Sequence, residues 1–112
     1  MSRLSKVSDQ IKDVVSIQFS GGRINDPRLQ NIAITAVKIT ADLRLATVYF
    51  RNYSDTPLEE VEVALEKITG YLKRKIATTT HSRRIPDLRF RYDVSIEVGS
   101  RIEKLLGEVI RV

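Results

Sequence analysis

One stretch of the sequence, from Pro57 to Ser82, constrains the fold more than any other, because its apolar residues keep a helical spacing over several turns. These residues follow one another at intervals of three or four: Val61, Leu65, Ile68, Leu72 and Ile76. Such spacing places them on one face of an α-helix. We therefore predict a long amphipathic helix that packs this face against a core and ends near Thr79.

A glycine inside this helix calls for a physical reason. Gly70 leaves the apolar spacing intact, yet glycine in a helix interior costs about 1 kcal/mol relative to alanine. A kink between two half-helices, or the close approach of another backbone, usually compensates such a cost. We expect one of these two features at Gly70.

Charge changes sign along the same helix. Its first part is acidic, and its second part and the residues beyond it are basic: Glu59, Glu60, Glu62 and Glu66, then Lys67, Lys73, Arg74, Lys75, Arg83 and Arg84. Complementarity to the helix macrodipole explains the order of the signs. It does not require the basic residues to continue beyond the helix, so an electropositive surface is a candidate functional feature.

The composition fits one small basic domain. The chain has 112 residues, which we assign to a single domain spanning 1–112, since this length is enough for one modest core. The formal net charge of +5 favours an anionic partner, most commonly nucleic acid. The sequence has neither an apolar run long enough to cross a bilayer nor the apolar core of a signal peptide, so we expect a cytoplasmic protein.

The order of the predicted elements is that of an α+β domain. An amphipathic helix opens the chain and stops at Gly21 and Gly22. Strands are expected at 32–40, 45–53 and 85–93, and a last amphipathic helix within 94–112. The predicted order is helix, strand, strand, kinked helix pair, strand, helix, with a three-stranded sheet packed against the helices.

Alternation along the strands predicts which side chains are buried. The second strand and the third strand each place apolar residues on one face: Ala46, Val48 and Phe50, then Leu88, Phe90 and Tyr92. Arg89 and Arg91 should face outward, and Thr47, Tyr49 and Arg51 should be partly open. The first strand shifts phase between Ile34 and Val37, which indicates a bulge or burial on both faces.

Polar residues mark the expected turns and caps. Asp42 can cap backbone amides in the loop between the first two strands. Asp55 or Thr56 is the expected N-cap of the long helix, with Pro57 in its first turn. Asp93 or Ser95 is the expected N-cap of the last helix.

The signatures of enzymes are missing. The chain contains one histidine, His81, and no cysteine, which leaves no basis for a zinc site or thiol chemistry. It has no GxxxxGK[ST] loop, no GxGxxG and no GxSxG, and the glutamates that begin the long helix should be solvated. A small hydrolase built on Asp42, Asp87 or His81 is the least favoured reading. We expect no catalytic residue, no metal and no cofactor.

Basic residues from consecutive elements form the candidate RNA-binding site. A compact α+β fold would bring them close enough together for several phosphate contacts: Lys73, Arg74, Lys75, Arg83, Arg84, Arg89 and Arg91. The sequence has no RNP-type aromatic strand and no GxxG loop of the standard KH kind. Four tyrosines could stack on bases, although such tyrosines more often lie at the core edge with a solvated hydroxyl: Tyr49, Tyr53, Tyr71 and Tyr92.

Several segments, taken in their order and spacing, resemble the ribosome-binding factor A family: the NDPRL loop, ITADLRLATVYF, ITGYLKR and IPDLRFRYDVSIEVGSRI. The likeness covers nearly the whole chain, from Val7 to Ile110. It implies a type-II KH-like fold in which an Ala-x-Gly kink between the two central helices replaces the phosphate-binding GxxG loop. In this chain the kink corresponds to Ile68, Thr69 and Gly70, with isoleucine where the family has alanine.

The resemblance also implies a function. The family acts as a non-enzymatic assembly factor that binds the free small (30S) ribosomal subunit. It assists late maturation of 16S rRNA, including processing near the 5′ end, and is often linked to cold adaptation. We expect the same of this chain, as a monomer with no membrane and no small-molecule partner. The charged C-terminal tail of some relatives is expected to be absent, because the chain ends soon after its last helix.

Two classes of function therefore stand side by side. The leading hypothesis is RNA binding on the small ribosomal subunit through the basic residues, without chemistry. The alternative is a protein-interaction module or homodimer that uses the exposed face of the hairpin: Thr47, Tyr49, Arg51 and Tyr53. Self-association that depends on concentration would favour the second.

Overall fold

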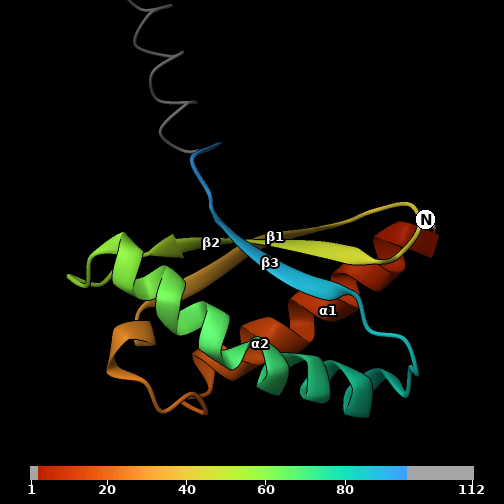
Figure 1. Ribbon diagram of the computed structural model, residues 1–112, viewed down its shortest axis with the longest axis horizontal. Coiled ribbons are helices and arrows are strands. Elements are labelled where there is room, and N and C mark those ends of the chain that lie inside the picture. Colours follow the sequence, from red (N-terminus) through yellow and green to blue (C-terminus); the bar gives the residue numbers. More distant parts are fainter. Residues whose placement is uncertain (1–2, 96–112) are drawn as a thin grey trace, which may run out of the picture.

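Two helices pack against one face of a three-stranded sheet (Figure 1). The computed structural model describes residues 3–95. The elements are α1 (Arg3–Ser20), the short 3-10 helix η1 (Pro27–Leu29), β1 (Ile32–Ile39), β2 (Leu45–Asn52), α2 (Leu58–Thr80) and β3 (Asp87–Tyr92). This order confirms the predicted α+β architecture from the first helix to the last strand. The predicted C-terminal helix lies almost entirely outside the described residues.

The sheet is mixed, and β2 is its central strand. Its order is β1-β2-β3, with β2 antiparallel to β1 and parallel to β3. The register of β1 on β2 shifts between Ile34 and Ala36, which confirms the predicted bulge. The bulge keeps Ile34 and Val37 on the same face although their positions differ by three, which in a regular strand would place them on opposite faces, and both pack against the core.

The core fills the space between the sheet and the helices in two adjoining clusters. One cluster joins α1, β2 and the second half of α2: Ile11, Val14, Val15, Ala46, Val48, Leu72 and Ile76. The other joins η1, β1, β2 and the first half of α2: Ile24, Leu29, Ile32, Phe50, Val61, Ala64 and Leu65. Ile68 packs against both. The apolar stripe predicted for the long helix is thus confirmed as its core face.

The ends of α2 differ in how well the sequence predicted them. The helix ends at Thr80, one residue after the predicted end, and His81 closes it in the left-handed conformation with φ 56°. The predicted N-cap is wrong, because Pro57 holds that position without a side-chain cap. Backbone Thr56 is instead held by Asn52 Nδ2, which donates to its carbonyl over 2.8 Å, and by Ser54 Oγ, which accepts from its amide.

The two predicted half-helices are joined in a single helix, whose ribbon changes direction near its middle (Figure 1). Thr69 Oγ1 donates to the carbonyl of Glu66 over 2.8 Å, and such back-bonding by threonine often accompanies a bend. The alternative explanation for Gly70, a close backbone approach, is wrong. Among residues 3–95, a Cβ built at Gly70 would meet Nη1 of Arg74 alone, at 3.6 Å.

Candidate nucleic-acid interface

A basic hollow of about 880 Å³ lies where the start of α1, the β1–β2 turn and the second half of α2 meet the segment before β3. Six of the residues that line it are basic: Arg3, Arg44, Lys73, Arg74, Arg83 and Arg84. Two carboxylates, Asp42 and Asp87, also line it. Cations therefore outnumber anions, and the hollow is suited to a polyanion.

The end of α2 explains why the arginines that follow it return to the hollow. His81 adopts φ 56°, and a left-handed residue at this position turns the chain away from the helix axis. Ser82 Oγ then donates to the carbonyl of Arg84 over 3.1 Å. This compact turn places Arg83 and Arg84 beside Lys73 and Arg74 in the same lining.

The β1–β2 turn supplies Arg44. Asp42 Oδ1 accepts from the hydroxyl of Thr40 over 2.6 Å and from the backbone amide of Arg44 over 3.1 Å, which confirms that Asp42 caps the loop. These bonds, that from Thr40 above all, lower the pKa of Asp42 below its ordinary value. Leu43 takes φ 61° to close the turn. Arg44 is thereby fixed at the rim of the hollow, next to an ionised carboxylate.

Most of the basic residues in the hollow are available to an external anion. Lys73 is the exception, because its Nζ lies 2.9 Å from Oδ1 of Asp87. That aspartate side chain is 80% exposed, and pairs in such exposed positions contribute little to stability. Among residues 3–95, none of the five arginines in the hollow forms an ion pair. Guanidinium groups can bind phosphate oxygens in a bidentate manner.

The structure divides the seven predicted RNA-binding residues into three places. Lys73, Arg74, Arg83 and Arg84 share the hollow. Lys75 lies outside it, with Nζ 5.6 Å from the ring centroid of Tyr71. Arg89 and Arg91 lie on the sheet, paired in register with Thr47 and Tyr49 of β2. The expectation that compaction would gather all seven side chains is therefore not met.

Two residues of the hollow, Arg3 and Arg44, were not anticipated from the sequence. Each is far along the chain from α2, and only the fold brings it near. A signal for Arg3 was nevertheless present, because it occupies the first turn of α1, which contains no acidic residue. A basic residue there opposes the usual preference at a helix N-terminus.

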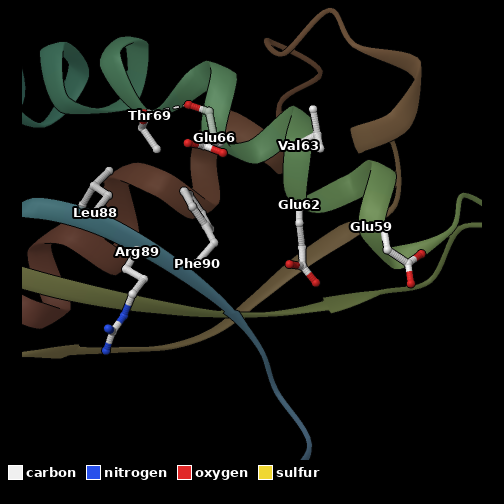
Figure 2. Close-up of a pocket in the computed structure, with 8 residues that line it drawn as sticks. All are labelled: Glu59, Glu62, Val63, Glu66, Thr69, Leu88, Arg89 and Phe90. Atoms are coloured by element: carbon white, nitrogen blue, oxygen red, sulfur yellow. Dashed lines mark hydrogen bonds between the residues drawn. The ribbon is translucent and has the colours of Figure 1, made fainter.

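A second hollow, of about 440 Å³, has the opposite character. It lies between α2 and β3, and Figure 2 shows three glutamates that line it from the helix: Glu59, Glu62 and Glu66. All three are exposed, in agreement with the prediction that they are solvated. In the same view Leu88 and Phe90 extend toward α2, whereas Arg89 extends from the opposite side of the strand. The two ends of α2 thus border hollows of opposite charge.

No helix in residues 3–95 is long and apolar enough to span a membrane. The described residues form a small α+β domain with a basic hollow beside one end of its sheet. Solved structures share this fold. The chain is similar to the crystal structure of ribosome-binding factor A from Thermus thermophilus, with a TM-score of 0.70 and 23% identity over 81% of this chain and 97% of that one. It is also similar to a homology model of T. thermophilus ribosome-binding factor A that was fitted into a cryo-EM map of a 30S–RbfA complex, with a TM-score of 0.63 and 24% identity over 78% and 91% of the two chains.

Sequence comparisons identify the family. The family model described as ribosome-binding factor A matches residues 3–106. Ribosome-binding factor A of Geotalea daltonii is 37% identical over 108 residues, which are 96% of this chain and 87% of that protein. The Geobacter sulfurreducens protein of the same name is 39% identical over 112 residues, with coverage of 96% and 92%. The chain belongs to the ribosome-binding factor A family.

Proposed function

We propose that this protein is a non-enzymatic assembly factor, a single-domain monomer that binds the free small ribosomal subunit and assists late maturation of 16S rRNA, including processing near its 5′ end. Membership of the ribosome-binding factor A family supports this proposal. So does the fold shared with a homology model of ribosome-binding factor A that was fitted into a cryo-EM map of a 30S complex. The basic hollow is the observation that carries it, because it offers a surface for RNA phosphate.

The hollow is suited to the backbone of folded RNA. Its cations come from three segments, the start of α1, the β1–β2 turn and the region around the end of α2, so they surround a bound group from several directions. Such contacts position a protein on RNA without reading the bases. They depend on salt, because each neutralised phosphate releases counterions.

The experiment compares two variants of equal net charge. R74Q/R83Q/R84Q removes three arginines of the hollow that have no carboxylate partner among residues 3–95. K12Q/R23Q/K67Q removes three basic residues that do not line the hollow. Binding to purified free 30S subunits is measured by co-sedimentation across a salt series.

The hollow variant should bind more weakly. Each lost phosphate contact should reduce the magnitude of the slope of log affinity against log salt by about 0.7 to 0.9, so the three substitutions together should reduce it by roughly 2 to 3. The matched variant should keep most of the wild-type slope. Equal losses in both variants would mean that only net charge matters, and an unchanged hollow variant would overturn the proposal. In cells that lack the protein, the hollow variant should also fail to restore the mature 5′ end of 16S rRNA.

The alternative, a protein-interaction module or homodimer at the hairpin face, has less support. Thr47 is only 8% exposed, because its cross-strand neighbours Lys38 and Arg89 lie on both sides of it. Arg51 already donates from Nη1 to the carbonyl of Asp93 over 2.7 Å. A second copy placed face to face would bring like charges together. Light scattering at high protein concentration should therefore report a monomer.

A further inference from the structure

No helix or strand of residues 3–95 covers the face of the sheet that points away from α1 and α2 (Figure 1). Its composition follows from the register, since side chains alternate along each strand. Ala46, Val48 and Phe50 are fully buried toward the helices. The cross-strand rows on the opposite face are Lys38–Thr47–Arg89 and Ala36–Tyr49–Arg91. Figure 2 shows this alternation directly in β3, where Arg89 points away from Leu88 and Phe90.

This open face is positively charged between its two ends. Lys38, Arg89 and Arg91 are exposed, and no carboxylate within residues 3–95 pairs with any of them. The acidic residues at the two ends of β3 are already engaged: Asp87, its first residue, with Lys73, and Asp93, which follows it, with Thr35 and Ser95. Arg89 and Arg91 are two residues apart on one strand, so their Cα atoms are separated by roughly 6.5 to 7 Å.

Tyrosines accompany these cations. Tyr49 lies in the row of Arg91, and Lys38 Nζ is 5.6 Å from its ring centroid. Tyr53 follows at the end of β2, where its amide donates to the carbonyl of Asn31 over 2.8 Å and continues the pairing with β1. Its side chain is 64% exposed. Cationic side chains together with accessible aromatic rings are the combination that single-stranded nucleic acids bind.

We propose that this open face is a second RNA-binding surface and that it holds a single-stranded segment of RNA. Lys38, Arg89 and Arg91 contact its phosphates, while the exposed ring of Tyr53 stacks on one of its bases. The inference rests on the proposed function, because it assumes that RNA is the partner. It adds a site that is separate from the basic hollow and that takes a different form of RNA.

The flat surface favours a single strand over a duplex. Bases in an RNA helix are stacked on one another and cannot reach an aromatic ring, whereas the splayed bases of a loop or an end can. A second copy of this chain fits the face poorly, since it would oppose cations with cations. Arg51 takes no part, because its guanidinium lies over the ring of Tyr92, 4.8 Å from the centroid, and binds the Asp93 carbonyl.

The test uses the full chain and two fluorescent probes, a 12-nucleotide single-stranded oligoribonucleotide of mixed sequence and the duplex of the same strand. R89Q/R91Q and Y53S should each weaken binding of the single strand roughly 5- to 10-fold. Y53F retains the ring and should stay within about twofold of wild type. K12Q/K67Q is the matched control for the loss of two charges and should weaken binding less than R89Q/R91Q.

Each outcome decides a separate question. The inference would be overturned if Y53F bound the single strand as weakly as Y53S does. It would also be overturned if the duplex bound the wild type as tightly as the single strand does and lost as much affinity in R89Q/R91Q and Y53S. A change of oligomeric state in R89Q/R91Q would overturn it as well, since the face would then contact another copy. If the sheet variants bind the single strand normally while R74Q/R83Q/R84Q loses 30S binding, this inference fails and the proposed function stands. If R74Q/R83Q/R84Q binds 30S subunits normally, the proposed function fails instead.

Discussion

Tyr71 of α2 donates its phenolic hydrogen to Oε1 of Gln18 of α1 over 2.6 Å. Gln18 is only 4% exposed, and Tyr71 packs against both core clusters. A side-chain amide oxygen that is removed from water on folding destabilises the protein unless it accepts a hydrogen bond. The bond therefore ties the two helices together at a point where the core is otherwise apolar.

Removing one partner of this pair should cost more than removing both. Y71F removes the hydroxyl that donates to Gln18, so the buried Oε1 of Gln18 is left without this hydrogen bond. This should lower the free energy of unfolding by about 1 to 3 kcal/mol. The double variant Y71F/Q18L replaces both groups by apolar ones and should recover most of that loss. Urea unfolding of the wild type, both single variants and the double variant measures the coupling. Additive losses would show that the bond does not hold the helices together.

Gly70 can be replaced with a gain in stability. The residue is exposed and lies inside α2, and a Cβ there would be in ordinary contact with Nη1 of Arg74, at 3.6 Å. G70A should therefore raise the free energy of unfolding by up to about 1 kcal/mol. Thermal and urea unfolding check this, with 30S binding measured in parallel because Arg74 belongs to the hollow. A loss of stability would mean that the change of direction in α2 depends on glycine.

His81 is also a site where glycine should help. It closes α2 at φ 56°, a conformation that costs a residue with a Cβ roughly 1 kcal/mol and that glycine adopts readily. H81G should raise the free energy of unfolding by about 0.5 to 1 kcal/mol. H81A is the matched control, since alanine keeps the Cβ and should bring no such gain. Equal changes in the two variants would exclude the backbone conformation as the cause.

Periodicity explains what the sequence could predict of the fold. The stripe on α2, the alternation in β3 and the phase shift in β1 all record which side chains face the core, so burial could be inferred from spacing alone. The N-cap of α2 could not, because Thr56 is held by Asn52 and Ser54. Several polar side chains near this helix end could form such hydrogen bonds, and the spacing of residues in the sequence does not show which of them do.

The candidate site was harder to predict than the fold. Spacing identified the basic residues of α2 and β3, and it correctly placed Arg89 and Arg91 on the outward face. It could not show that this face and the hollow are separate surfaces, or that Arg3 and Arg44 complete the hollow. Tyr71 illustrates the same limit. It was a candidate for stacking on bases, and the structure places its hydroxyl on a buried partner instead.

Asp93 should make stability depend on pH at the acid end. Its carboxylate accepts from Thr35 Oγ1 over 2.5 Å and from the amide of Ser95 over 2.9 Å. These bonds, that from Thr35 first, lower its pKa from 3.8 to about 2. Because the folded protein favours the ionised form, the stabilisation is complete above the ordinary pKa of 3.8 and is lost as the pH falls from there through about 2. Urea unfolding between pH 6 and pH 2 should show this loss in the wild type.

Two substitutions separate Asp93 from the other carboxylates that titrate in the same range. D93N cannot ionise and should lose less stability than the wild type between pH 4 and pH 2, while being less stable at pH 6. T35V keeps the carboxylate but removes its strongest hydrogen bond, so its acid loss should lie between those of D93N and the wild type. The pKa of Asp26 is also lowered, mainly by its side-chain hydrogen bond with Arg28. D26N should therefore also reduce the loss of stability on acidification, and it measures the contribution of a separate carboxylate for comparison with D93N. If D93N lost as much stability on acidification as the wild type, the bonds of Asp93 to Thr35 and Ser95 would not be the source of the effect.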